Sequence, residues 1–168
     1  TQCTSGSYLD SCNGNNGRSS PVEVTLPTGR TATAVTTGYD FTCAILDDAS
    51  VWCWGKNNYG QLGVGNASTG IWSYSPSQTL IPAGRTAIAI SAGYDFACAV
   101  LDNNSLACWG YNNNYQLADG TSSTRTTPVH SGGSIKFNSV STSAEYACGI
   151  SIENLALKYS ESPPVSIA

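Results

Sequence analysis

The sequence predicts an all-β chain built from repeated antiparallel strand units, and three observations support this prediction. The heptamer LPTGRTA at residues 26–32 recurs as IPAGRTA at 81–87, and GYDFTCA at 38–44 recurs as GYDFACA at 93–99. Within each copy, short segments alternate with the period of a strand, and helical periodicity is absent. The 17 Gly, the 7 Pro and the many Ser, Thr and Asn suit short strands joined by turns.

Each complete copy predicts three strands and a disulfide. In the first copy the strands lie at about 32–36, 42–46 and 50–54, and short polar residues at 47–49 and 102–104 suit three-residue hairpin loops in the two copies. With the loop tip at its central residue, Cys43 lies opposite Cys53. Directly opposed residues are about 4.5–5.5 Å apart, which is within reach of a disulfide. The same register places Cys98 opposite Cys108.

A weaker third copy begins near residue 135 and carries AEYAC at 144–148. Counting from Cys148, Lys158 stands where the bridging cysteine is expected, so this unit is incomplete. We therefore divide the chain into the tail of a partial repeat at 1–25, complete repeats at 26–80 and 81–134, and a degenerate repeat at 135–168.

The composition of the chain restricts which cellular compartment and which classes of binding partner we expect. The chain has 168 residues, seven Lys and Arg against eleven Asp and Glu, a net charge of −4 and a pI near 4.6. This balance argues against nucleic acid and anionic membranes as partners, and no apolar run approaches the ~20 residues of a membrane span. Seven cysteines favour an oxidising compartment, and the absence of Met predicts a processed precursor. We expect an extracellular or cell-surface protein.

The repeat unit resembles the RCC1 repeat, one blade of an RCC1-like β-propeller. The resemblance rests on G-Y-D-F-x-C-A-x-L-D, then C-W-G-x-N-x-x-x-Q-L, and is clearest in WGKNNYGQLG at 54–63. It implies antiparallel four-stranded blades, and the cysteine pairs look like those of secreted prokaryotic members. The family's functions include guanine-nucleotide exchange, chromatin docking, enzyme inhibition and surface roles, so the fold alone does not choose among them.

RCC1-like propellers resemble one another in closing with about seven blades, whereas this chain has about three. The chain is then either a fragment or a subunit of an assembly. The segment at 15–22 resembles the blade-closing loop at 121–129. We hypothesise that residues 1–25 of one copy act as a strand donor that completes the third blade of a neighbour, with Cys3 bonded to Cys148. The alternative pairs Cys3 with Cys12 and leaves Cys148 a buried free thiol.

Residues suited to catalysis or to holding a cofactor are scarce. His130, the only histidine, is expected in a solvated loop, and the cysteine spacing does not suit a zinc site. Asp47, Asp48 and Asp102 are expected as turn formers. Asp40 and its equivalent Asp95 are expected to make hydrogen bonds between blades. We predict no cofactor, no metal and no enzymatic activity.

The aromatic residues offer a binding surface. Strand alternation places Trp54 and Trp109 in the core. Aromatic side chains near the last strand of each unit are candidates for a ligand or assembly contact, because exposed Trp and Tyr suit sugar stacking or a protein hot spot: Trp72, Tyr74, Tyr111 and Tyr115. Asn66 and Asn103 begin N-x-S sequons.

The sequence thus predicts a secreted structural or adhesive module that self-assembles into a ring or extracellular filament of identical subunits through blade completion. The alternative function is a propeller that binds a glycan or a surface protein through exposed aromatics and Asn-rich loops. A third class, an exchange factor or chromatin dock, is disfavoured by the low pI and the expected disulfides.

Overall fold

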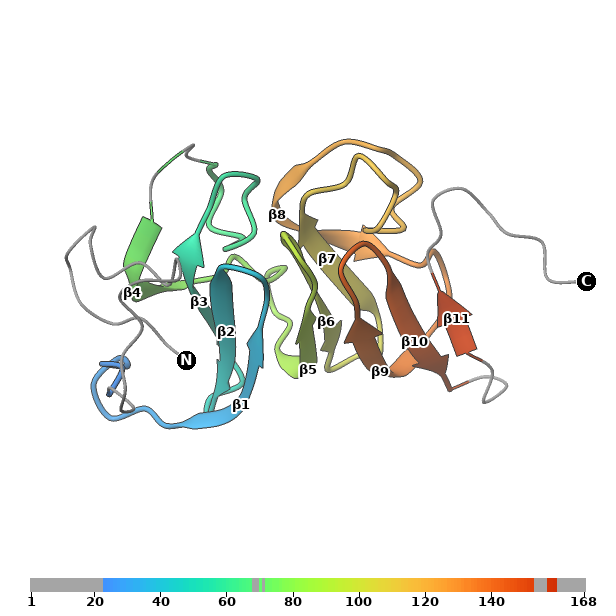
Figure 1. Cartoon of the computed structure of the whole chain (residues 1–168). Coiled ribbons are helices and arrows are strands. Elements are labelled where there is room, and N and C mark those ends of the chain that lie inside the picture. The colour runs from blue at the N-terminus through green and yellow to red at the C-terminus, as the bar shows by residue number, and fades with distance from the viewer. Residues whose placement is uncertain (1–22, 68–69, 71, 153–156, 160–168) are drawn as a thin grey trace, which may run out of the picture.

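The computed structural model describes residues 23–67, 70, 72–152 and 157–159, the last range by its backbone, and these residues form three antiparallel sheets (Figure 1). Blade 1 contains β1 (Ala32–Thr37), β2 (Phe41–Leu46), β3 (Val51–Lys56) and β4 (Trp72–Gln78). Blade 2 contains β5 (Ala87–Ala92), β6 (Phe96–Leu101), β7 (Leu106–Gly110) and β8 (Arg125–Ser131). Blade 3 contains β9 (Phe137–Thr142), β10 (Ala147–Ser151) and β11 (Leu157–Tyr159). Among these residues no helix has the length and apolar character needed to cross a membrane.

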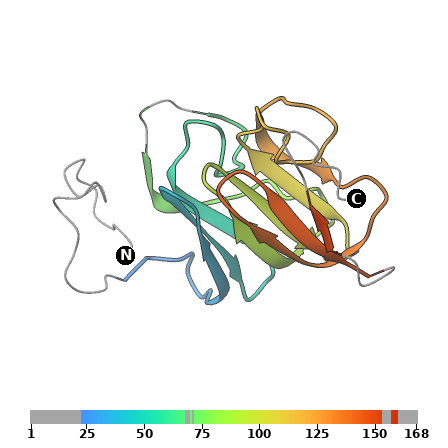
Figure 2. The ribbon, with the colours of Figure 1, turned by 45° about the vertical axis from the view of Figure 1, so that its right-hand side comes forward.

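The sheets stand side by side, with the first strand of each blade nearest to the neighbouring blade (Figure 2). In all three blades each strand pairs with the next strand along the chain, so the strand order follows the sequence. β5 contacts both β1 and β9, so these three first strands form one continuous inner wall. The all-β architecture predicted from the sequence is therefore confirmed, and blades 1 and 2 are antiparallel four-stranded sheets as expected.

Both disulfides and both hairpin registers match the sequence prediction. Cys43 pairs with Cys53 across β2 and β3, and Cys98 pairs with Cys108 across β6 and β7. Each pair is joined by a disulfide with a Cα–Cα distance of 4.1 Å. Among the described residues Cys148 is a free thiol.

The second hairpin loop fits the prediction, with Asn104 left-handed at φ 63°, and the loop of blade 1 departs from it in one respect. In each loop a short side chain fixes the turn, because Asp48 Oδ1 accepts the Ser50 N–H (3.0 Å) and Asn103 Oδ1 accepts the Ser105 N–H (3.1 Å). The left-handed residue is the last of the three, at φ 61° for Ala49. A polar residue is therefore not required there, because the preceding turn already holds the backbone in place.

Strand alternation divides the core into two layers between blades. The Cys43–Cys53 face of blade 1 packs against the Trp109 face of blade 2, where Ala97, Ala99 and Leu101 are also buried. The opposite face of blade 2 carries the Cys98–Cys108 disulfide and packs against Phe137 and Ala147 of blade 3. Trp109 is 0% exposed and Trp54 is 5% exposed, so both are core residues as predicted.

The register of blade 3 corrects one sequence prediction. Cys148 lies opposite Tyr159 on β11, and Lys158 lies opposite Gly149. The third hairpin is thus one residue longer than its counterparts. In blades 1 and 2 a disulfide fixes the register, whereas no second cysteine follows Cys148 and the pairing is free to shift.

Candidate functional site

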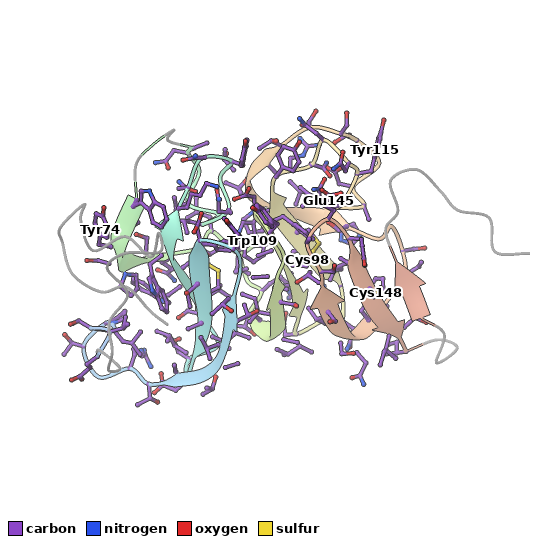
Figure 3. The ribbon with its side chains drawn as sticks, in the orientation of Figure 1. Tyr74, Cys98, Trp109, Tyr115, Glu145 and Cys148 are labelled. Carbon is purple, nitrogen blue, oxygen red and sulfur yellow. A yellow bond between two sulfur atoms is a disulfide. The ribbon has the colours of Figure 1, made fainter. Side chains whose placement is uncertain are left out.

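Tyrosine side chains gather at one end of the blades, where the first strand turns into the second and where the third strand ends. We call this surface the tyrosine end. Its members come from equivalent loops of blades 1 and 2: Tyr39, Tyr59, Tyr94, Tyr111 and Tyr115. Figure 3 shows Tyr115 and Glu145 at this end of the molecule.

Two aromatic pairs organise the tyrosine end. Tyr39 and Tyr94 are stacked across the boundary between blades 1 and 2, with ring centroids 4.0 Å apart and an interplanar angle of 15°. Tyr59 and Tyr111 meet edge to face at 4.8 Å and 62°, also across this boundary. Both geometries are favourable for aromatic rings. The exposed fractions of Tyr39, Tyr94 and Tyr115 are 61%, 43% and 51%, so a ligand can reach these rings.

The backbone holds the stacked pair in place. The Tyr39 N–H donates to the Tyr94 carbonyl at 3.1 Å, and the Tyr94 N–H donates to the Ala144 carbonyl of blade 3 at 3.1 Å. A hydrogen bond with Tyr39, followed by burial and the nearby phenol and carboxylates, raises the pKa of Tyr94 to about 12. Tyr94 is therefore a neutral phenol at physiological pH.

A charged cluster lies beside the tyrosines. Lys56 Nζ is 3.2 Å from Asp95 Oδ1 and 3.8 Å from Asp40 Oδ2. Gln61 of blade 1 donates to Asp95 Oδ1 of blade 2 at 2.7 Å. Burial raises the pKa of Asp40, Lys56 opposes this effect, and Asp95 adds to it. The hydrogen bond expected between blades is confirmed for Asp95, which joins blades and is 8% exposed.

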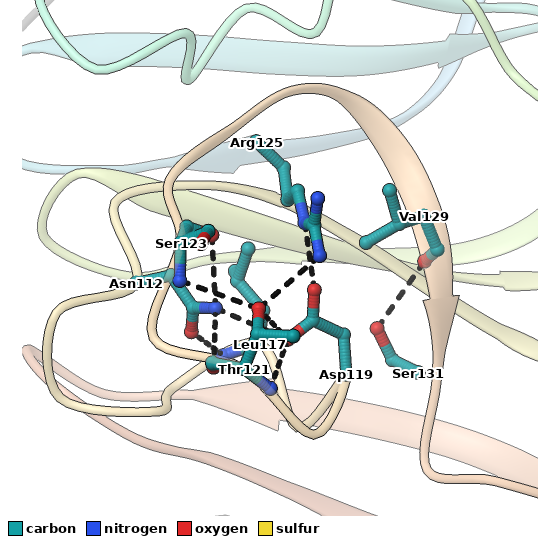
Figure 4. A network of polar contacts seen from close by, with 8 residues as sticks. All are labelled: Asn112, Leu117, Asp119, Thr121, Ser123, Arg125, Val129 and Ser131. Carbon is teal, nitrogen blue, oxygen red and sulfur yellow. Dashed lines mark hydrogen bonds and ion pairs between the residues drawn. The ribbon is translucent and has the colours of Figure 1, made fainter.

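The loops after β3 and β7 are shaped by two buried amides. Asn57 Oδ1 accepts the Leu62 N–H at 3.1 Å, and Asn112 Oδ1 accepts the Leu117 N–H at 2.9 Å. Asn112 Nδ2 also donates to the Thr121 and Ser123 carbonyls at 2.8 and 3.0 Å (Figure 4). These bonds give backbone groups of the two loops hydrogen-bond partners without regular secondary structure, and so help to position the aromatic side chains.

Asp119 closes the loop of blade 2 (Figure 4). Its carboxylate accepts from Arg125 Nε at 2.7 Å, the Thr121 N–H at 2.9 Å and the Thr121 hydroxyl at 2.8 Å. Burial alone would raise the pKa of Asp119, but the hydrogen bonds from Arg125 and Thr121 outweigh it and lower that pKa.

The structure brings together some of the predicted contact residues and separates others. Tyr111 and Tyr115 belong to the tyrosine end, and Trp72 lies opposite Lys56 at the start of β4, half-buried. Tyr74 is half-buried further along β4. His130 is exposed as expected, but it lies in β8 rather than in a loop.

Asn66 and Asn103, the asparagines of the two sequons, are both exposed. Asn66 accepts hydrogen bonds from the buried Asn57 amide at its carbonyl and its side chain. The Asn103 side chain is held by Ser105. Glycosylation of either asparagine stays a prediction. Cys3 and Cys12 lie outside the described residues.

Sequence reasoning missed Tyr39, Tyr94, Lys56 and Tyr59 as surface residues. The available signal was the repetition of Gly-Tyr-Asp-Phe, which placed Tyr39 and Tyr94 at equivalent positions. Their stacking depends on the distance between two blades, which no local pattern encodes. Within the described residues no group of three or more His, Cys, Asp and Glu could hold a metal ion. Stacking rings, phenols and carboxylates together suit binding.

Comparison with known proteins identifies the family. Two models described as "Regulator of chromosome condensation (RCC1) repeat" match, one at residues 32–61 and 87–116 and the other at 48–100. The chain belongs to the RCC1-like repeat family. The ultraviolet-B receptor UVR8 of Arabidopsis thaliana is 34% identical over 91 residues, covering 54% of this chain and 20% of UVR8.

Solved structures of RCC1-like repeat proteins show the same fold. Human WBSCR16 aligns with a TM-score of 0.69 and 23% identity, over 77% of this chain and 33% of that chain. Yeast RCC1 (Prp20), in its complex with Kap60, aligns with a TM-score of 0.62 and 19% identity, over 71% and 30%. The chain thus spans a fifth to a third of these relatives.

Proposed function

We propose that this RCC1-like chain is an extracellular structural module that associates head to tail, blade against blade, into a ring or filament of identical subunits. The observation that carries the proposal is the open outer face of blade 3, formed by Tyr146, Cys148 and Ile150. In blade 2 the equivalent residues Phe96 and Val100 are 0% exposed because blade 3 covers them. In blade 3, Tyr146 is 52% and Ile150 is 38% exposed.

Blade 1 offers the complementary surface on its inner strand, because Ala44, Leu46 and Trp54 of its outer face are already buried within the single chain. Its outer face, formed by Thr42, Ala44, Leu46, Trp52 and Trp54, is equivalent to the face of blade 2 that packs on blade 1. On the inner strands, Ile90 is half-buried at the contact between blades 1 and 2. Its equivalent Val35 is 66% exposed. The two ends of the chain carry the two sides of one blade contact, which is the arrangement of a heterologous interface.

A covalent joint between Cys3 and Cys148 of a neighbour extends this proposal. The half-buried thiol of Cys148 occupies the position of the disulfide-bonded Cys43 and Cys98. Two thiols lose two electrons and two protons to an extracellular oxidant, such as a disulfide-exchange protein, when the bond forms. The alternative remains a bond between Cys3 and Cys12 with Cys148 free.

The proposal also includes an extracellular location for the protein. Two disulfides form within the described blades, and such bonds persist in oxidising surroundings. In an assembly outside the cell, both disulfides would therefore persist.

Sedimentation velocity and electron microscopy of the full chain test the assembly. We expect wild-type protein to associate with rising concentration, and Ile150→Glu to raise the dissociation constant at least about tenfold by placing a charge in the joint. Ile88→Glu is the matched control, since Ile88 is 52% exposed and lies on blade 2 away from both open faces. A monomer at every concentration, or equal effects of both variants, contradicts the proposal.

Gel electrophoresis tests the covalent joint. Non-reducing gels should show a ladder that collapses to a monomer on reduction and is lost in Cys148→Ser. A monomer band under both conditions contradicts the Cys3–Cys148 bond while leaving non-covalent association to be judged by sedimentation.

The tyrosine end favours a second candidate function, binding of a glycan or a surface protein. Exposed stacked tyrosines next to carboxylates and Asn-rich loops can stack on sugar rings and hydrogen-bond to their hydroxyls. Titration calorimetry with oligosaccharides selected on a glycan array should show saturable binding. Tyr115→Ala and Trp72→Ala should weaken it about tenfold, and Ile88→Ala should not. Absence of saturable binding, or equal loss in all three variants, argues against this function.

A further inference from the structure

The two stacked tyrosines occupy equivalent turns of neighbouring blades. Tyr39 and Tyr94 each lie between the first and the second strand of their blade. The Tyr39 N–H donates to the Tyr94 carbonyl, and the Tyr94 N–H donates to the Ala144 carbonyl, both at 3.1 Å. Ala144 is thus the equivalent residue of blade 3. The backbone repeats the same contact at both blade boundaries, but only the boundary between blades 1 and 2 carries a ring on each side.

The stacking geometry brings the reactive parts of the two phenols together. The ring centroids of Tyr39 and Tyr94 are 4.0 Å apart and the planes differ by 15°, so the faces of the rings overlap. The side chains also share a hydrogen bond, which is the main cause of the raised pKa of Tyr94. Because the rings are nearly parallel and their hydroxyl ends meet, the carbons next to the two phenol oxygens face each other across the stack.

Both rings are open to solvent. Tyr39 is 61% and Tyr94 is 43% exposed, so an oxidant in solution reaches them and the rings have room to tilt after they react. The second aromatic pair of this surface differs in geometry. Tyr59 and Tyr111 meet edge to face, with centroids 4.8 Å apart at 62°, so the faces of these rings do not overlap. The tyrosine end therefore holds one pair arranged for coupling and one that is not.

The boundary between blades 1 and 2 has no covalent support from the disulfides of the described residues. Each of these disulfides joins two strands of a single blade. The two blades contact each other through apolar packing. A bond between Tyr39 and Tyr94 would close this boundary at its exposed end. Two groups held side by side in one chain react with each other in preference to groups on separate chains.

We propose that Tyr39 and Tyr94 are a modification site, at which hydrogen peroxide and an extracellular haem peroxidase join the two phenols as dityrosine. The product is a covalent link between blades 1 and 2 of one chain. This inference goes beyond the functions proposed above, because the link requires neither a second copy of the chain nor a bound ligand.

The reaction is a two-electron oxidation. Each phenol loses one electron and one proton and becomes a phenoxyl radical, and hydrogen peroxide takes up both electrons and both protons to form two water molecules. The radicals join through a single C–C bond between the two facing carbons next to the phenol oxygens. The hydrogen on each of these carbons then moves to the oxygen of its own ring, which restores both phenols.

Peptide mapping of the full chain tests the site. The protein is diluted until sedimentation shows only monomer, treated with a haem peroxidase and hydrogen peroxide, reduced and digested with trypsin. Cleavage after Lys and Arg leaves Tyr39 as the only tyrosine of residues 31–56 and puts Tyr94 in residues 86–125. We expect these two peptides to be linked, with a mass lower than their sum by two hydrogen atoms, and to show dityrosine fluorescence. Absence of this linked pair overturns the proposal.

Conservative variants assign the link to its two residues. Tyr39→Phe and Tyr94→Phe keep the rings but remove one phenol, and each should abolish the linked pair. Tyr115→Phe is the matched control, because Tyr115 is 51% exposed and lies on the same peptide as Tyr94, and it should leave the pair unchanged. A linked pair that survives in Tyr94→Phe, or that is lost in Tyr115→Phe, overturns the assignment.

Denaturation separates the stacked geometry from random collision. In concentrated urea the disulfides remain but the blades come apart, so the yield of the linked pair should fall at least about tenfold. An equal yield in urea would show that the fold does not direct the coupling, and would overturn the proposal.

Discussion

Asp119 shows how a single residue can make this fold sensitive to acid. Its side chain is 4% exposed and accepts four hydrogen bonds, from Asn112, Thr121 and Arg125, and those from Arg125 and Thr121 lower its pKa. A carboxyl group whose pKa is lower in the folded chain than in the unfolded chain stabilises the fold above its ordinary pKa of 3.8. That stabilisation disappears as the pH falls through the lower, folded value.

We predict that Asp119→Asn reduces the free energy of unfolding at neutral pH and flattens its decline below pH 3.8. Urea unfolding at a series of pH values measures both effects. Asp102→Asn is the control, because the Asp102 ion pair with Arg85 is exposed on both sides and exposed pairs contribute little. An acid profile of Asp119→Asn that parallels the wild type would count against this role.

At the scale of elements, the disulfide-linked hairpin is the repeated unit of stability. Cys43, Cys53, Cys98 and Cys108 are all 0% exposed, and each bond closes a hairpin with a sequence separation of 10. Replacing Cys98 and Cys108 together by alanine should lower the free energy of unfolding by about 2–4 kcal/mol, because the unfolded chain gains freedom. Urea denaturation measures the loss. Cys148→Ala should cost clearly less, because Cys148 closes no hairpin among the described residues, and an equal cost would refute this account.

At the scale of the whole molecule, blade 2 is the most protected part of the described chain. All six residues of β6 are buried, since blade 1 covers one face of the sheet and blade 3 covers the other. Blades 1 and 3 each have an outer face outside these two layers. We predict the slowest amide exchange in β6 and β7 and faster exchange in β10, measured by mass spectrometry at dilute concentration.

Association should change this pattern in a specific way. At high concentration β10 should gain protection, because a second copy covers Tyr146 and Ile150, while β6 should not change. Protection that rises in β6, or that stays constant in β10 while chains associate, would place the joint elsewhere.

Much of the fold could be predicted because the sequence repeats itself. Two copies of one pattern gave two independent tests of the hairpin register, and the paired cysteines satisfied both. Blade 3 has no second cysteine to constrain its register. The sequence therefore predicted Lys158 opposite Cys148, whereas Tyr159 lies there. The left-handed Ala49 was missed because hydrogen bonds of the turn, rather than its own side chain, hold its backbone.

The candidate site was predicted only in part for a physical reason. Tyr111 and Tyr115 were singled out from local aromatic density, whereas the stacking of Tyr39 on Tyr94 arises where two separate sheets meet. The sequence by itself determined the strands, the hairpins and the disulfides, because their contacts lie within one repeat. Only the tertiary structure decided which surfaces are open and which polar groups lack partners. Ile150 has the same local pattern as the buried Val100 but is exposed, and the Trp54 indole has the same local pattern as that of Trp109 but lacks a hydrogen-bond partner. In both cases the difference lies in the neighbouring blade.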